Sequence, residues 1–254
     1  MANGEVKLTA EKVRKREKAL IVLRIILLVI VVLLSLLYII LKLIYEIGSF
    51  TVTLDTSYNL EGALVIYENR EQKLCLDTLK AEELEFMTNI TESWIPKNLQ
   101  DGPDGSNNGS NYIAYTFYAE NQGKEVINYW RTIEITDVIK NADDAIRVKV
   151  IKDGVETLYA KASPRTNEAE PGTIAFLKED EIVDRYHHNH HGDKDKNKGI
   201  VMLEKEENFK PGDVHKYTVI IWIEGEDPEC VDNIIGGEVK MRMRLTEEHI
   251  EQEH

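Results

Sequence analysis

The stretch at residues 25–41 reads IILLVIVVLLSLLYIIL and carries no charge. Its one small polar side chain is Ser35. As a helix rising ~1.5 Å per residue, it would span roughly 25 Å of the ~30 Å hydrocarbon core of a membrane. Arg24 and Lys42 flank it, one at each end, where long cationic side chains can reach the lipid headgroups. The sequence therefore predicts a single transmembrane helix over residues 19–47.

Two other interpretations of this apolar stretch are a buried core helix and the apolar part of a cleavable signal peptide. A core helix would carry a polar face, and this stretch has none. A signal peptide has a shorter apolar region that ends in small residues, whereas this one ends in the bulky run Lys42–Ile47. We therefore expect a retained anchor.

The charges around the apolar stretch predict its orientation. Residues 48–53, which follow it, carry no charge, and seven cations precede it: Lys7, Lys12, Arg14, Lys15, Arg16, Lys18 and Arg24. Because cationic flanks tend to stay in the cytoplasm, the N-terminus is expected there. Residues 1–18 then form a cytoplasmic basic tail, and residues 48–254 form an extracellular domain held at the cell membrane.

Charge divides the chain into two contrasting parts. The whole chain has a formal net charge of −14 and residues 1–47 contribute +4, which leaves −18 for residues 48–254. Such an acidic domain is a poor partner for nucleic acid or for anionic lipid. Contact with the lipid bilayer is therefore expected through the N-terminal helix. We identify no small-molecule substrate from the sequence and expect no cofactor.

Residues 48–254 show the alternation of apolar and polar side chains that is typical of β-strands. The pair Asp153-Gly154 predicts a β-hairpin between strands at 145–151 and 155–160. A short helical turn is expected at 80–85, and further strands are expected at 49–54, 62–67, 111–119, 128–138, 215–223 and 238–245. The last of these alternates with cations, which would also suit a sheet edge. We therefore predict an all-β domain.

Two loops contain side chains that can bind metal ions. The Gly- and Asn-rich segment 96–111 is expected to be a surface loop that buries no apolar area. Its Asp101, Asp104 and Asn107 are oxygen ligands suited to calcium, but the calcium-loop pattern DxDxDG is missing. The second loop, HHNHHGDKDKNK, carries the weak candidates His187, His188, His190, His191, Asp193 and Asp195. Because the HExxH pattern of zinc proteases is absent, we expect adventitious metal binding there.

The two cysteines, Cys75 and Cys230, both lie in the outer segment. In an oxidising compartment they can pair, but a domain of this size can build its own core without a disulfide. The sequence leaves both alternatives open. Zinc-finger spacing is absent, and we identify no base that would activate either thiol as a catalytic nucleophile.

The run YTVIIWIEGEDPECVDNIIGGEVKMRMRLTEE, residues 217–248, resembles the C-terminal signature of the TasA- and camelysin-type surface proteins of Gram-positive bacteria. In that signature a W-x-E-G-x-D-P-x-C segment precedes I-I-G-G and an alternating final strand. The segments 112–120 and 146–161 also lie where that family places strands. The resemblance covers roughly residues 113–248 and is strongest at its end.

The resemblance implies a jelly-roll β-sandwich displayed at the cell surface, with fibre-forming biofilm-matrix proteins among the relatives. It also implies donor-strand exchange, in which an extended N-terminal segment of one subunit completes the sheet of the next. The matching donor segment here is Ser49, Phe50, Thr51, Val52, Thr53 and Leu54. The chain departs from the family at its N-terminus, where the family has a cleaved signal and this chain has a long apolar stretch. A retained stretch would tie the donor segment to the membrane and would oppose free polymerisation.

Together, these features favour a membrane-tethered structural or adhesion protein that is not an enzyme. Its expected partners are copies of itself or related surface and matrix proteins. The alternative is an exported metal-dependent hydrolase that uses His187–His191 with Asp193. A membrane sensor would need an additional partner, because the short cytoplasmic tail contains no signalling domain.

Overall fold

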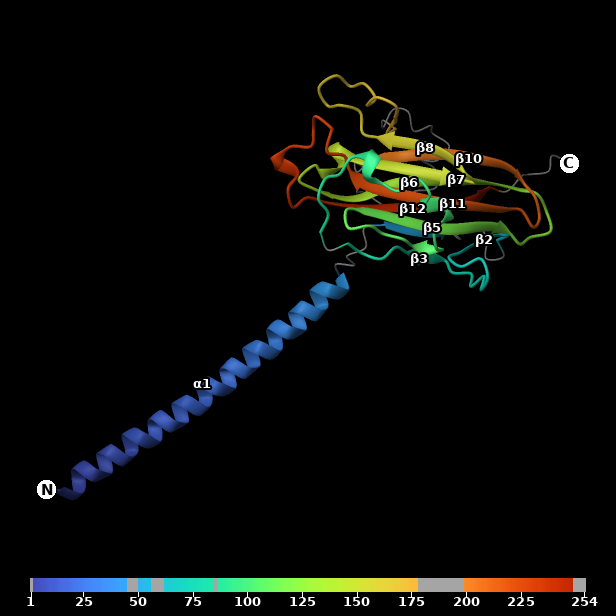
Figure 1. Cartoon of the computed structure of the whole chain (residues 1–254). Helices are drawn as coiled ribbons and strands as arrows, with labels where there is room; N and C mark the ends of the chain where they lie inside the picture. The colour runs from blue at the N-terminus through green and yellow to red at the C-terminus, as the bar shows by residue number, and fades with distance from the viewer. Residues whose placement is uncertain (1, 45–49, 56–61, 85, 178–198, 249–254) are drawn as a thin grey trace. The chain divides into compact units, whose positions relative to one another are not determined.

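The computed structural model describes residues 2–44, 50–55, 62–84, 86–177 and 199–248. The chain divides into two compact units, residues 1–47 and residues 48–254 (Figure 1). The first unit contains one long helix, and the second consists mostly of β-sheet.

Helix α1, Ala2–Ile44, forms the N-terminal unit. Within the described part of the chain, Leu20–Tyr38 is the stretch long and apolar enough to cross a membrane, and none of it is buried. The hydroxyl of Ser35 donates a 2.9 Å hydrogen bond to the Val31 carbonyl one turn earlier, which satisfies it inside the helix. The predicted helix is confirmed over residues 19–44, and its exposed side chains contradict the core-helix interpretation.

The second unit contains two β-sheets (Figure 1). Among the described residues, sheet A has the strand order β10-β6-β12-β1-β3. These strands are Ile200–Phe209, Ile127–Ile139, Glu238–Glu248, Phe50–Asp55 and Thr78–Lys80. Four short 3-10 helices lie in the described connections: η1 Glu92–Trp94, η2 Leu99–Asp101, η3 Ala142–Ala145 and η6 Asp232–Ile234.

Sheet B follows the path β2-β5-β11-β7-β8-β9, and β4 also pairs with β5. Along that path its strands are Leu64–Tyr67, Tyr112–Asn121, Val214–Ile223, Ile146–Lys152, Val155–Ala160 and Ile174–Ala175. Strand β4 is Gly105–Ser106. The prediction of a domain built mostly from β-strands is confirmed.

The two sheets bury one apolar core between them. Phe50 and Met243 of sheet A belong to the same buried cluster as Tyr115, Phe117 and Val219 of sheet B. The rings of Phe50 and Tyr115 meet edge to face with their centroids 6.3 Å apart, a favoured geometry for aromatic pairs.

A second apolar cluster covers the outer face of sheet B. Ile95 and Leu99, from the segment before β5, pack with Ala114 and Trp222 of the sheet. Strand β5 is consequently buried on both faces along nearly its whole length. The prediction that segment 96–111 buries no apolar area was wrong, because its turn residues carry Leu99 across the sheet.

The predicted hairpin joins β7 and β8, whose last ladder pair is Lys152↔Val155. Asp153 and Gly154 have φ values of 49° and 85°. Two consecutive positive φ values are what a type I′ turn requires, and asparagine, aspartate and glycine are the residues that adopt them most readily. The hairpin prediction is confirmed.

Strand β12 has the predicted one-sided burial, with Met243 and Leu245 on its inner face. It is not an edge strand, however, because it lies between β6 and β1. Its cations face a carboxylate on the neighbouring strand: nitrogens of Arg242 and Arg244 each lie 2.6 Å from Glu134 Oε1. The cations of β12 therefore stabilise its pairing with β6 inside the sheet.

Two local predictions differ from the structure. Strand β10 was not predicted, because its register shifts after Ile200 and again after Glu206, and these shifts interrupt its alternation. The helical turn expected at 80–85 is not present in the described residues 81–84. Lys80 instead ends β3.

Candidate functional site

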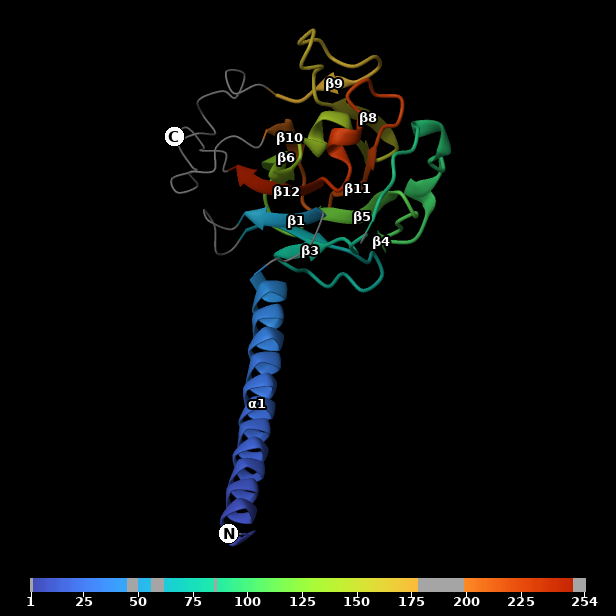
Figure 2. The same cartoon turned by 90° about the vertical axis from the view of Figure 1, so that its left-hand side faces the viewer.

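The strand that follows the apolar helix lies inside sheet A. Strand β1 pairs in parallel with β12, from Phe50↔Met241 to Asp55↔Thr246. On its other side it pairs antiparallel with β3, so that β1 lies between these two strands (Figure 2). The predicted donor segment thus completes the sheet of its own chain, apart from Ser49, which lies outside the described residues.

The two faces of β1 differ in burial. Phe50 and Val52 are fully buried in the core, whereas Thr51 and Thr53 on the opposite face are half-buried. Full burial of an apolar side chain of this kind contributes about 1.5–3 kcal/mol. Core packing of two side chains, together with two hydrogen-bonded ladders, therefore holds β1 in place.

Strand β3 covers only part of β1. It pairs with three residues of β1, from Thr51↔Lys80 to Thr53↔Thr78, and forms one edge of sheet A. The β12 ladder on the other side runs the full length of β1. A strand that replaced β1 would keep the long template of β12, after β1 itself had left both ladders and the core.

Polar contacts hold β12 independently of β1. Arg242 Nε and Arg244 Nη2 both donate to Glu134 Oε1 on β6, at 2.7 and 2.6 Å. Near the end of β12, Glu247 Oε2 accepts a 3.0 Å hydrogen bond from the Leu64 N–H, where β2 of the other sheet begins. The template strand is thus anchored to both sheets.

The two cysteines are free. Cys75 Sγ lies 3.9 Å from Gln122 Nε2, just beyond the end of β5, whereas Cys230 follows the opposite end of the β5–β11 ladder. The nine residue pairs between these ends span about 27 Å at ~3.4 Å per residue. A disulfide requires Cα atoms within ~7 Å, so Cys75 and Cys230 do not pair within one chain.

The three side chains of segment 96–111 that are suited to calcium lie in different surroundings. Asp104 accepts hydrogen bonds at both oxygens, from the Tyr118 hydroxyl at 2.7 Å and the Arg70 N–H at 3.1 Å. Asp101 ends η2 and is exposed, and Asn107 packs against a glycine. Asp104 therefore fastens its loop to β5.

One group of carboxylates in the described part of the chain could hold a metal ion: Glu170, Asp227 and Glu229. The sequence analysis missed this group. Asp227 and Glu229 lie together in the D-P-x-C run, but no sequence pattern connects that run to Glu170. The histidine-rich loop lies outside the described residues, and with it the weak metal candidates His187, His188, His190, His191, Asp193 and Asp195.

Comparisons with known proteins assign no family to this chain. No family model and no curated protein matches it. Among solved structures, it is similar to the crystal structure of β-glucosidase from Kluyveromyces marxianus in complex with glucose, at 12% identity and a TM-score of 0.21. The match covers 71% of this chain and 15% of that chain. At this TM-score the similarity supports no conclusion about fold or function.

Proposed function

We propose that this chain is a single-pass membrane protein with a cytoplasmic N-terminus, and that its β-domain is a structural or adhesion module at the cell surface. The cations that precede the apolar stretch support this orientation. The resemblance at residues 217–248 supports a jelly roll of the TasA and camelysin type. On this proposal the domain works by binding other surface proteins rather than by catalysis.

Helix length supports a retained anchor over a cleaved signal peptide. The apolar region of a signal peptide is roughly 7–15 residues long. Here the membrane-competent stretch has 19 residues and lies within a continuous helix of 43. A helix that extends beyond the apolar stretch at both ends suits a permanent membrane span.

The observation that carries the proposal is the position of β1. It begins at Phe50, six residues after α1 ends at Ile44. A membrane tether that continues into an interior strand passes load directly to the core, because extracting the strand would break two ladders and expose Phe50 and Val52. This arrangement suits a domain that is held at a membrane while it binds partners.

We further propose that the position of β1 is the site of assembly. The β1 of a second copy, or of a related surface protein, would pair with β12 through its backbone and bury alternate side chains in the core. The exchange requires the resident β1 to leave both of its ladders and the core. The tethered chain then serves as the base on which related subunits assemble.

Disulfide trapping tests the exchange. Thr53 and Thr78 are opposite partners on β1 and β3, away from the core face. In a Cys75→Ser/Cys230→Ser background, whole chains carrying Thr53→Cys are mixed in detergent micelles with chains carrying Thr78→Cys and then oxidised. We expect an interchain disulfide, because β1 of one chain would lie beside β3 of the other.

Two matched samples make this result decisive. The double variant Thr53→Cys/Thr78→Cys should close within one chain, which checks the register. Pairing Thr53→Cys with Glu168→Cys, on an exposed loop, measures random collision. Strand exchange would be contradicted if the double variant closes normally but the interchain product does not exceed this background. The proposed membrane tether does not depend on this result.

A further inference from the structure

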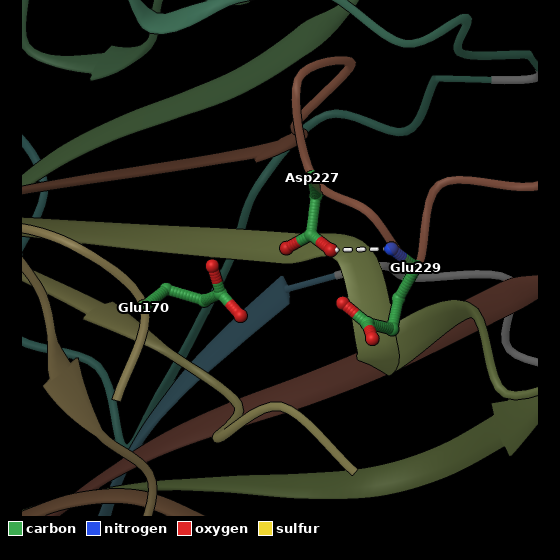
Figure 3. A group of neighbouring side chains, drawn as sticks. All are labelled: Glu170, Asp227 and Glu229. Atoms are coloured by element: carbon green, nitrogen blue, oxygen red, sulfur yellow. Dashed lines mark hydrogen bonds between the residues drawn. The ribbon is translucent and has the colours of Figure 1, made fainter. Parts of the chain in front are cut away.

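Three carboxylates from two loops converge at one side of β7 (Figure 3). Glu170 comes from the loop between β8 and β9, and Asp227 and Glu229 come from the loop after β11. One oxygen of each lies within 4.8 Å of the other two. Because calcium binds oxygen at ~2.3–2.6 Å, two of its ligands can lie up to about 5 Å apart. One ion can therefore contact all three side chains.

Glu229 carries a buried oxygen without a hydrogen-bond partner, and its carboxylate lies on the side that faces Asp227 and Glu170 (Figure 3). Its side chain is 9% exposed, and its Oε2 has no hydrogen-bond partner. Its Oε1 lies 3.0 Å from an Arg165 nitrogen and 3.4 Å from Ser163 Oγ. A buried carboxylate oxygen without a hydrogen-bond donor is destabilising, even where Arg165 pairs with the other oxygen, so Oε2 is the atom that most needs a ligand.

The neighbouring arginines do not balance the charge of the group. Arg147 is buried and lies 2.7 Å from Asp227 Oδ2 and 4.0 Å from Glu170 Oε2. Arg165 is 67% exposed, so solvent screens its charge. Three carboxylates thus face one buried guanidinium and one solvated guanidinium.

We propose that Glu170, Asp227 and Glu229 bind one calcium ion, which fastens the β8–β9 loop to the loop after β11. Calcium accepts carboxylates in flexible geometry and completes a shell of 6–8 oxygens with carbonyls and water, whereas magnesium demands a near-ideal octahedron. Extracellular calcium modules bind with dissociation constants of about 0.1–1 mM, which suits a domain outside the cell. The extracellular setting rests on the proposed function, but the binding itself does not.

The test is a calcium titration of the whole chain in detergent micelles after removal of metals with EDTA. Calorimetry should detect a single ion per chain, and Tm should rise by about 5–10 °C when calcium exceeds its dissociation constant a hundredfold. Glu229→Gln and Glu170→Gln should each weaken binding about tenfold or more. Glu168→Gln changes an exposed carboxylate in the same loop as Glu170 and should bind as the wild type does.

Stability without metal separates a lost ligand from a damaged fold. In EDTA, the Tm of Glu229→Gln should equal or exceed that of the wild type, because the change removes a repelling charge. The Tm of Glu170→Gln in EDTA tests the same expectation independently. Imidazole prefers transition metals, so the histidine-rich loop should not bind the calcium probe. No calcium-dependent rise in Tm at about 10 mM, or equal affinity in both variants and the wild type, would overturn the proposal.

Discussion

At the scale of single residues, a buried pair of hydroxyls links the two sheets. Tyr129 of β6 and Tyr217 of β11 are fully buried with their oxygens 2.6 Å apart, and the Tyr129 hydroxyl also lies 2.6 Å from His215 Nδ1. Tyr129→Phe removes this partner of the Tyr217 hydroxyl. We expect it to lower the free energy of unfolding by about 1–3 kcal/mol, measured by urea unfolding in detergent.

The double variant shows whether the bond itself matters. Tyr129→Phe/Tyr217→Phe should lose less than the sum of the single changes, because neither hydroxyl remains without the other. Tyr112→Phe, at the partly exposed start of β5, is the matched control and should change stability by less than about 0.5 kcal/mol. Additive losses in the double variant would contradict the account of this pair.

The partly buried histidine beside this pair, His215, makes stability depend on pH. Burial and then the Lys152 ammonium lower the pKa of His215, although Asp153 and Glu206 oppose them. As pH falls below about 6.5, His215 is protonated more readily in the unfolded chain than in the folded chain. The free energy of unfolding therefore decreases as pH falls. Between about pH 7.5 and 5.5, the wild type should lose more unfolding free energy than His215→Gln.

Urea unfolding at both pH values measures this difference. An equal loss in wild type and His215→Gln would show that other groups cause the pH dependence. The sequence predicted the strands that hold these residues but not their hydrogen bonds. Tyr129 and Tyr217 are 88 positions apart, and strand alternation does not identify partners across two sheets.

At the scale of elements, β1 owes its place to its inner face. Val52→Ala shortens a fully buried side chain and should cost about 1–3 kcal/mol in unfolding free energy. Thr53→Ala, the next residue on the half-buried face, should cost less than about 0.5 kcal/mol. Urea unfolding of both variants compares the two faces directly. Equal losses would mean that the ladders, rather than the core, hold β1.

Elements with a clear local signal could be predicted from the sequence. The Asp153-Gly154 turn and the alternation of β12 are such signals, since each depends on neighbouring residues alone. The interior position of β12 could not be predicted, because it depends on β1, nearly two hundred residues earlier. The carboxylates of Glu170 and Asp227 meet for the same kind of reason, through a topology that joins distant loops.

At the scale of the whole molecule, the chain joins a cationic, apolar helical segment to an acidic β-domain. The formal charge of −18 on residues 48–254 would keep this domain away from anionic headgroups, while the cations before the apolar stretch favour the cytoplasmic side. The helix and its flanking charges were readable from the sequence because a membrane span is set by length and composition alone.

Thiol labelling tests the central claim, a retained helix with the β-domain outside the cell. Cys75 is exposed on the β-domain, and an Ala2→Cys change in a Cys75→Ser/Cys230→Ser background marks the opposite end of α1. With a membrane-impermeant maleimide, we predict that Cys75 reacts in intact cells. The Ala2→Cys thiol should react only after permeabilisation, on a chain that still carries the β-domain. Labelling of Ala2→Cys in intact cells, protection of Cys75, or a mature chain without its N-terminal helix would contradict the account.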